Sequence, residues 1–246
     1  MTLKDKIVLV TGSSSGIGQA AAIAFAREGA NVIVHYNTSK DGADVTANEI
    51  SKLGATAFIV QADLTKQDEV DAMFQRIKEK FGKIDVLVNN AGGTIDQPDL
   101  LDIDVWRATF DRNLFSLIMC CGAGIKLMVE GGKIVNVSSV YGNSRAGSKV
   151  FPAYAAAKAA VNSLTQTLSK ALSPKILINA VAPGYTITPA WGEMPDSDRA
   201  TYGKRKLIER FITPEEVADA IMFLAKNDAM AGEVLTIDGG LSLKTV

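Results

Sequence analysis

Short apolar runs alternate along the chain with longer segments in which apolar residues recur at helical spacing. Most of the runs are continuously apolar, which is typical of strands that are covered on both faces. These expected strands lie at residues 7–10, 31–36, 56–61, 84–89, 133–137, 176–181 and 233–237. The segments between them predict helices at residues 16–29, 41–53, 67–81, 101–129, 153–172 and 214–226.

Repeated strand–helix units predict a parallel sheet, because successive parallel strands are joined by right-handed helical crossovers. With 246 residues and no linker or internal repeat, the chain fits one α/β domain. We therefore predict a single Rossmann-type domain over residues 1–246, a doubly wound parallel sheet of about seven strands with helices on both faces. Residues 188–213 are irregular and long for a loop, so they form either a lid or substrate-binding segment or a surface excursion.

Composition and charge exclude some classes of function and partner. Hydrophobic residues make up 47% and charged residues 22%, which allows a large buried core. The formal net charge is −1, so there is no basic excess to neutralise nucleic-acid phosphates, and we expect no nucleic-acid partner. The first apolar run is far too short for a signal peptide or a membrane span, so we expect no membrane partner.

The cysteines and the histidine indicate in which cellular compartment the protein works and whether it binds a metal. Cys120 and Cys121 are neighbours in an apolar segment and cannot brace a fold, so we expect a reduced, cytoplasmic setting. His35 is the only histidine, so no histidine cluster can hold a metal, and we expect no metal cofactor.

A glycine-rich turn follows the first expected strand and precedes an alanine-rich helix. Gly12 permits a tight turn, Gly16 lets the backbone approach a pyrophosphate, and Gly18 lets the helix pack close to the sheet. The helix N-terminus offers free N–H groups and a positive dipole end to phosphates. The pattern predicts a dinucleotide site, the alternative being a glycine-rich connection without a ligand. Its expected residues are Gly12, Ser14, Ser15, Gly16, Ile17 and Gly18.

The end of the second expected strand bears on the choice of cofactor. A site specific for NAD usually has an acidic residue here, which bonds the ribose 2′-hydroxyl. This chain has Tyr36, Asn37, Thr38 and Ser39, with Lys40 beside them, and nothing in that set repels a 2′-phosphate. The sequence therefore favours NADP(H) over NAD(H), the alternative being that these residues only cap the next helix.

Tyr154 and Lys158 are four residues apart within an expected helix, so they share one helix face. A free phenol has a pKa near 10, which is too high for useful proton exchange at neutral pH. A fixed ammonium beside the phenol favours the phenolate and lowers that pKa. Tyr154 is therefore a candidate general acid and base, although a pair at this spacing is often only a surface contact.

Other motifs accompany this pair along nearly the whole chain. In order, they are Thr11-Gly12-Ser13-Ser14-Ser15-Gly16-Ile17-Gly18, Asp63-Leu64, Asn89-Asn90-Ala91-Gly92, Asn113, Val137-Ser138-Ser139, Tyr154 with Lys158, Pro183-Gly184 with Thr188, and Asp238-Gly239-Gly240. With this set the chain resembles the short-chain dehydrogenase/reductase family, and within it the 3-oxoacyl-[acyl-carrier-protein] reductases. The resemblance implies an oxidoreductase that transfers a hydride between a nicotinamide and a carbonyl or secondary alcohol carbon.

The resemblance also implies a role for each catalytic residue. Ser139 bonds the substrate oxygen and Tyr154 is the general acid and base. Lys158 also bonds the nicotinamide ribose, and Asn113 interrupts its helix and holds a water that passes protons to Lys158. Ser139 lies 15 positions before Tyr154 (154 − 139), slightly more than is usual in the family, and the extra residues fall in 143–150 beside the substrate site. Ser138 is thus the alternative to Ser139.

Several expected cofactor contacts follow the ends of apolar strands, where ligands bind in open α/β sheets. Ordinary turn chemistry and helix capping are the alternatives for these residues. Those implied by the resemblance are Asp63, Leu64, Asn90, Ala91, Gly92, Tyr154, Lys158, Pro183, Gly184, Thr186 and Thr188.

Two readings of function from different classes remain: an active carbonyl reductase, and a catalytically silent nucleotide sensor. Such sensors commonly lose the tyrosine or the lysine, and this chain keeps both, which favours the enzyme. A sugar or polyol dehydrogenase is the alternative within enzymes.

Partners are expected to be a small carbonyl or alcohol substrate and further copies of the chain. The helices at 101–129 and 153–172 are apolar on more than one face, which predicts a homo-oligomer, a tetramer by resemblance. The apolar residues concerned are Leu114, Leu117, Ile118, Met119, Ala160, Val161, Leu164 and Leu168. An acidic acyl carrier protein is disfavoured because Glu130 would repel it. The only basic residues near Glu130 are Lys126 and Lys133. A different basic surface could come from the 188–213 loop, the alternative being a solvated face, with Arg199, Lys204, Arg205, Lys206 and Arg210.

Overall fold

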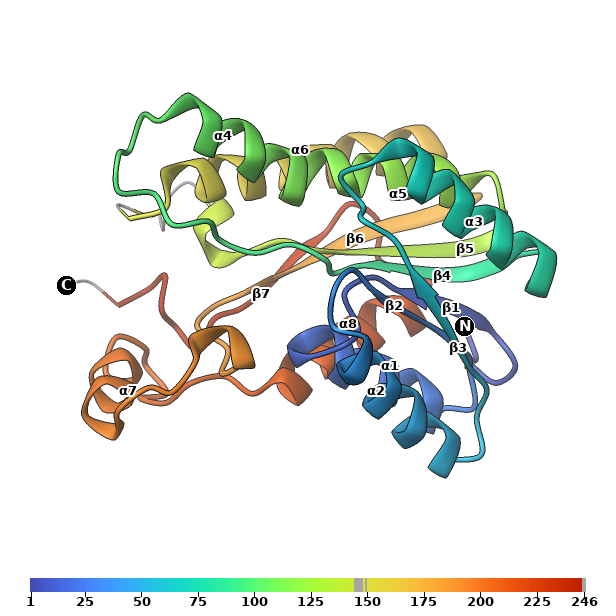
Figure 1. Cartoon of the computed structure of the whole chain (residues 1–246), viewed down its shortest axis with the longest axis horizontal. Coiled ribbons are helices and arrows are strands. Elements are labelled where there is room, and N and C mark those ends of the chain that lie inside the picture. The colour runs from blue at the N-terminus through green and yellow to red at the C-terminus, as the bar shows by residue number, and fades with distance from the viewer. Residues whose placement is uncertain (144–147, 149, 245–246) are drawn as a thin grey trace.

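A parallel sheet of seven strands forms the centre of the computed structural model, which describes residues 1–143, 148 and 150–244 (Figure 1). The strands are β1 (Ile7–Val10), β2 (Asn31–Tyr36), β3 (Ala57–Gln61), β4 (Ile84–Asn89), β5 (Met128–Val137), β6 (Ile176–Pro183) and β7 (Val234–Ile237). Their order across the sheet is β3-β2-β1-β4-β5-β6-β7, and each neighbouring pair is parallel. The expected seven-stranded, doubly wound α/β sheet is confirmed.

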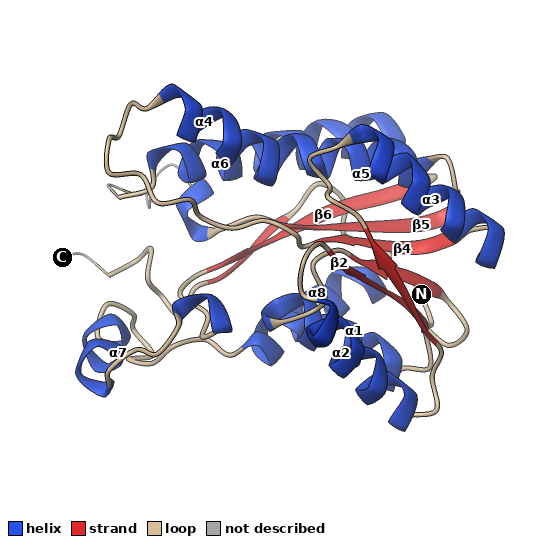
Figure 2. Cartoon of the chain, in the orientation of Figure 1, coloured by secondary structure: helices blue, strands red, loops and turns tan. Residues whose placement is uncertain are grey.

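Helices cover both faces of the sheet (Figure 2). One layer holds α1 (Gly16–Arg27), α2 (Lys40–Lys52) and α8 (Pro214–Lys226). The other holds α3 (Gln67–Phe81), α4 (Ile103–Phe110), α5 (Ser116–Ile125) and α6 (Pro152–Leu172). A short helix, α7 (Asp196–Gly203), lies at one end of the molecule near the C-terminal segment. Within the described ranges, none of the helices combines the length and apolarity needed to cross a membrane.

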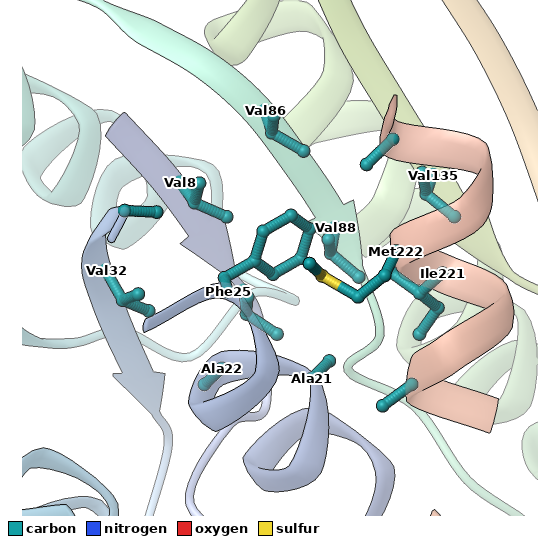
Figure 3. Packing of buried hydrophobic residues seen from close by; sticks show 14 of the residues in the cluster. Val8, Ala21, Ala22, Phe25, Val32, Val86, Val88, Val135, Ile221 and Met222 are labelled. Carbon is teal, nitrogen blue, oxygen red and sulfur yellow. The ribbon is translucent and has the colours of Figure 1, made fainter. Parts of the chain in front are cut away.

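Each layer has its own core against the sheet, which explains why the strands are apolar on both faces. In the first core, Phe25 of α1 is wholly buried among Val8, Val86 and Val88 of the sheet and Met222 of α8 (Figure 3). Burying a side chain of this size contributes about 1.5–3 kcal/mol. The second core packs α3, α5 and α6 against the opposite face.

The expected helix at 101–129 is wrong at its C-terminal end. It is divided into α4 and α5 by a π-helical turn at Asp111–Phe115, and it ends at Ile125. Met128 already belongs to β5, where it pairs with Ile84 and is buried. The apolar residues around Met128 suit a helix or a buried strand equally, so periodicity could not locate this boundary.

Residues 188–213 are more regular than expected. They contain a 3₁₀ turn at Pro189–Trp191 as well as α7. The backbone of Ile208 donates to the carbonyl of Gly239 at 3.2 Å, and Leu207 packs on Gly240. The segment is therefore fastened to the Asp238-Gly239-Gly240 turn that follows β7.

Strand order reverses between β1 and β4, which run side by side, so their carboxyl ends leave a crevice. The glycine turn follows β1, and Asn90 follows β4. Ser138 and Ser139 follow β5, while Gly184 follows β6. The fold thus brings motifs from four distant parts of the chain to one edge of the sheet.

Candidate active site

A cavity of about 1120 Å³ opens at these carboxyl ends. Most residues expected to bind cofactor or to catalyse line this one space. They are Gly12, Ser14, Ser15, Gly16, Ile17, Asn37, Thr38, Ser39, Asp63, Leu64, Asn90, Ala91, Gly92, Ser139, Tyr154, Lys158, Pro183, Gly184, Thr186 and Thr188. Three expected residues, Gly18, Tyr36 and Asn113, are absent from the lining and lie behind it.

The glycine turn has the backbone that its sequence requires. Gly12 and Gly16 have φ angles of 63° and 57°, in the left-handed region that glycine adopts most easily. A Cβ at Gly18 would collide with the carbonyl oxygen of Gly12, so α1 can pack this close only without a side chain there. Asn90 supports the turn through its Nδ2, which donates to the carbonyls of Thr11 and Gly12 at 2.8 and 3.1 Å.

His35 is a supporting residue that sequence reasoning missed. Its Nδ1 accepts a hydrogen bond from the backbone N–H of Gly12 at 2.9 Å, and its Nε2 lies 3.0 Å from the carbonyl oxygen of Ala62. Burial lowers the pKa of His35 to about 4. The ring is therefore neutral near pH 7, with its proton on Nε2. The signal available in the sequence was that His35 is a polar residue within a run of apolar strand positions.

The N-terminus of α1 fits the phosphates of a dinucleotide. Gly16 and Ile17 open the helix and line the cavity, and Ser15, the N-cap, makes no capping hydrogen bond with its side chain. The first turn, all of it described, carries no acidic residue. Backbone donors and the positive end of the helix dipole therefore face the cavity without a competing anion in that turn.

The residues at the end of β2 face either the core or the cavity. Tyr36 is half-buried and packs against the first core, whereas Asn37, Thr38 and Ser39 line the cavity. Lys40 is exposed and pairs with Asp44 at 2.6 Å. The groups that the connection from β2 to α2 presents to the cavity are thus uncharged hydrogen-bonding side chains.

Tyr154 and Lys158 lie on α6 as the spacing predicts. Lys158 Nζ is 5.6 Å from the centroid of the Tyr154 ring and donates to the carbonyl of Val137 at 2.8 Å. Burial lowers the pKa of Lys158 to about 8. Burial also raises the pKa of Tyr154, an effect that the Ser139 hydroxyl partly opposes. The lowering of the Tyr154 pKa by Lys158 stays a prediction for the cofactor-bound protein.

The two serines after β5 have different partners. The Ser138 hydroxyl donates to the backbone carbonyl of Lys158 at 3.1 Å, which ties β5 to α6. The Ser139 hydroxyl accepts from the backbone N–H of Tyr141 at 3.2 Å and is the one beside the Tyr154 phenol. This geometry favours Ser139 as the substrate-facing residue. Of the extra residues in 143–150, positions 144–147 and 149 lie outside the described residues.

Asn113 acts on the glycine segment after β4. Its Nδ2 donates to the carbonyls of Gly93 and Thr109, and its Oδ1 accepts from the backbone N–H of Gly93 at 2.9 Å. A Cβ at Gly92 would lie 2.7 Å from Asn113 Oδ1 and 3.5 Å from Lys158 Nζ. The expected helix interruption is confirmed by the π-helical turn. The water that would pass protons to Lys158 stays a prediction.

Similar proteins of known sequence or structure are reductases and dehydrogenases. The family model described as enoyl-(acyl carrier protein) reductase matches residues 12–242. The chain is 39% identical to a 3-oxoacyl-[acyl-carrier-protein] reductase of Synechocystis sp., over 97% of this chain and 98% of that protein. It is 38% identical to 3beta-hydroxysteroid dehydrogenase 1 of Eggerthella lenta, over 98% and 95% of the two chains. The crystal structure of an angucycline C-6 ketoreductase with bound NADP superposes with a TM-score of 0.91 at 33% identity, covering 99% of this chain and 98% of that one.

Proposed function

Because this chain belongs to the short-chain dehydrogenase/reductase family, we propose that it is an NADP(H)-dependent reductase of small, soluble ketones. Membership makes it an NAD(P)-dependent oxidoreductase that acts on carbonyl or alcohol carbons. The observation that carries the finer proposal is the meeting of Ser139, Tyr154 and Lys158 at one wall of the cavity that begins at the glycine turn.

Each of these side chains has a role in moving a proton at the substrate oxygen. When bound, the cofactor supplies the hydride that reduces the carbonyl carbon. The Ser139 hydroxyl donates a hydrogen bond to the carbonyl oxygen and polarises it. The Tyr154 phenol gives its proton to that oxygen as negative charge develops on it, and takes one back in the oxidative direction.

The Lys158 ammonium has N–H donors that remain available to bind the cofactor. Its ammonium is buried, and among the described residues the carbonyl of Val137 is the one acceptor that it meets. A buried ammonium has three donors, so two remain for ribose hydroxyls or for a water. Its positive charge favours the Tyr154 phenolate, which makes the proton transfer easier. Asn113 keeps the Gly92 backbone beside this ammonium.

The preference for NADP(H) rests on Asn37, Thr38 and Ser39. These side chains line the cavity at the end of β2 and place no carboxylate there that would repel a 2′-phosphate. The NADP in the ketoreductase structure supports the same choice. We expect NADPH to bind more tightly than NADH, and Thr38→Asp to reduce or reverse that difference because a carboxylate repels the phosphate.

The chain is proposed to work as a homotetramer in the cytoplasm on free substrates. Leu114, Leu117 and Val161 are buried in the chain's own core and so give no support to an outer apolar face. Phe115 of the π-helical turn and Ile118 of α5 are exposed on one layer, and Phe223 of α8 is exposed on the other. Two separate apolar surfaces are what a tetramer of D₂ symmetry requires.

The test is oxidation of NADPH in the presence of a panel of ketones, with polyols and NADP⁺ assayed in the reverse direction. We expect ketone reduction with kcat/KM higher for NADPH than for NADH. Polyol oxidation without ketone reduction would support the sugar or polyol dehydrogenase instead. Cofactor binding without turnover on any substrate would support the nucleotide sensor.

A further inference from the structure

Aromatic side chains gather at the end of the cavity that lies beyond Tyr154. Four of them, Tyr141, Tyr185, Trp191 and Tyr202, line the cavity and are called the aromatic wall. The ring of Tyr185 lies 6.2 Å from Tyr141, 5.7 Å from Trp191 and 5.5 Å from Tyr202, each time edge to face. The wall thus combines residues from the segments that follow β5 and β6 and from the 188–213 segment into one aromatic surface.

Hydrogen bonds hold the wall in place. The hydroxyls of Tyr141 and Tyr185 are 2.9 Å apart, and Trp191 Nε1 donates to the carbonyl of Thr186 at 2.8 Å. Phe211 is buried behind the wall, 5.1 Å from the Trp191 ring. The aromatic surface therefore exists before any substrate binds, which reduces the entropy that binding costs.

The wall begins beside the reacting groups. Tyr141 follows Ser139 by two positions and donates its backbone N–H to the Ser139 hydroxyl. Tyr185 follows Gly184, which lines the cavity with Tyr154. A substrate whose carbonyl meets Ser139 and Tyr154 therefore extends its body along the aromatic wall.

One cation, Arg205, lines this end of the cavity, and a second, Lys206, is buried outside the lining. Arg205 lines the cavity with its Cζ 4.7 Å from the centroid of the Tyr202 ring. Lys206 is buried, with Nζ 4.3 Å from the Phe211 ring and 4.8 Å from the Tyr185 ring. Among the described residues, no carboxylate lies within ion-pair distance of either cation. The ring-stacked guanidinium of Arg205 can therefore bind an anionic group.

We propose that the substrate is a ring ketone that carries a carboxylate, with its ring against the aromatic wall and its carboxylate on Arg205. This inference rests on the proposed function and names its substrate class. A rigid ring gains stacking and edge contacts with aromatic side chains. An open chain of the same size gains fewer such contacts and loses rotational freedom at every bond that the site immobilises.

The test compares three compounds by kcat/KM with NADPH: 3-oxoindane-1-carboxylate, its methyl ester, and 4-oxodecanoate, an open-chain acid of the same size. The first and third have the same spacing between ketone and carboxylate, so they differ in the ring. The first and second differ in charge. We expect the ring acid to exceed both of the others by about fivefold or more.

Variants assign each preference to its residue. Trp191→Leu should remove most of the preference for the ring, while Trp191→Phe, which keeps an aromatic face, should retain it. Arg205→Gln should remove the preference for the acid over its ester. Arg199→Gln is the matched control, because Arg199 is on the same segment but lines a separate groove. Both preferences should persist in that control.

Equal or higher kcat/KM for the open-chain acid would overturn the inference and leave the proposed ketone reductase intact. An acid preference that survives Arg205→Gln would overturn the role of Arg205. Absence of turnover with every ketone would overturn both the inference and the proposed function.

Discussion

The imidazole of His35 accepts a hydrogen bond from the backbone N–H of Gly12, the first glycine of the turn that faces the cavity. Two backbone donors join the same segments: the N–H of Ser13 donates to the carbonyl of His35 at 2.9 Å, and the N–H of His35 donates to the Ser13 hydroxyl at 3.0 Å. The acceptor at Nδ1 exists only while the ring is neutral. Protonation of His35 would therefore break the bond that fixes the glycine turn to β2.

The free energy of unfolding is expected to fall between pH 6.5 and pH 4 because of His35. Its pKa is about 4 in the folded protein and about 6.5 in an unfolded chain. In that window the unfolded state binds a proton that the folded state does not, so stability decreases as pH falls. The loss from this group between pH 7.5 and pH 5 is about 2 kcal/mol. Urea unfolding at the two pH values measures it.

His35→Asn is the control for this prediction. Asparagine keeps an acceptor that can meet the Gly12 N–H but does not titrate, so this share of the pH dependence should vanish while NADPH still binds. His35→Ala should weaken NADPH binding because the turn loses its support. An Asn variant with the full wild-type pH dependence would show that other groups cause it.

Tyr154→Phe is expected to lower kcat by about 10²-fold or more, because the ring stays and the transferable proton is lost. The dissociation constant for NADPH should change little. Tyr36→Phe is the matched control, since it removes a hydroxyl from a tyrosine that lies outside the cavity lining. If Tyr154→Phe kept about half of the wild-type kcat, the acid–base role would belong to another group.

Much of the fold and of the candidate site was predictable, because both depend on local patterns. The alternation of apolar runs with helical segments determines a parallel sheet, and the ends of its strands determine where ligand-binding residues collect. The four-residue spacing of Tyr154 and Lys158 places both on one face of α6.

Other features depend on tertiary contacts that no local pattern encodes. Successive residues of a strand point to opposite faces, so at the end of β2 His35 supports the glycine turn while Tyr36 packs into the core. The sequence indicated a segment that lines the cavity but not which of its side chains face that cavity. The partners of Lys133 and Arg210 likewise come from α8 and the residues beside it, and the sequence alone could not pair them.

Asp228→Asn is expected to destabilise the fold by about 1–2 kcal/mol, because it leaves the ammonium of Lys133 buried without a carboxylate. Lys133 is 2% exposed and donates to Asp228 at 2.7 Å, whereas Asp228 itself is largely exposed, which limits the effect. Lys133 holds the pKa of Asp228 at about 2, so this contribution is present above pH 4 and is lost as pH falls through about 2.

Glu28→Gln is the control for the Asp228 prediction. Glu28 pairs with Lys226 at 3.0 Å with both side chains exposed, so its loss should cost less than about 0.5 kcal/mol. Urea unfolding of both variants at pH 7 makes the comparison. Equal stability losses would mean that the burial of Lys133 does not matter.

Charged substitutions on the two exposed apolar faces are expected to reduce the size of the assembly in steps. Phe115, which ends the π-helical turn, is 48% exposed, Ile118 of α5 is 41% exposed, and Phe223 of α8 is 48% exposed. Phe115→Glu with Ile118→Glu, or Phe223→Glu alone, should give dimers in light scattering, because each removes one interface. Val45→Glu, at an exposed apolar residue of α2, should leave the size unchanged. A wild-type monomer would contradict the proposed tetramer.

A carrier protein should bring no advantage to the substrate, because three of the basic residues are already occupied within the chain. Lys133 is buried against Asp228, Lys206 is buried beneath the aromatic wall, and Arg210 pairs with Glu216 through both of its terminal nitrogens, at 2.8 and 2.6 Å. Glu130 is exposed and repels an acidic partner.

The measurement is kcat/KM for one 3-oxoacyl group attached either to acyl carrier protein or to a short thiol, at about 50 mM and about 500 mM salt. We expect the two forms to agree within about threefold and to respond alike to salt, since a docking surface for an acidic protein would be screened at the higher concentration. Glu130→Lys should raise kcat/KM for the carrier-bound form alone, and only at low salt. A strong preference of the wild type for the carrier-bound form, lost at high salt, would instead identify the chain as a reductase of the fatty-acid type.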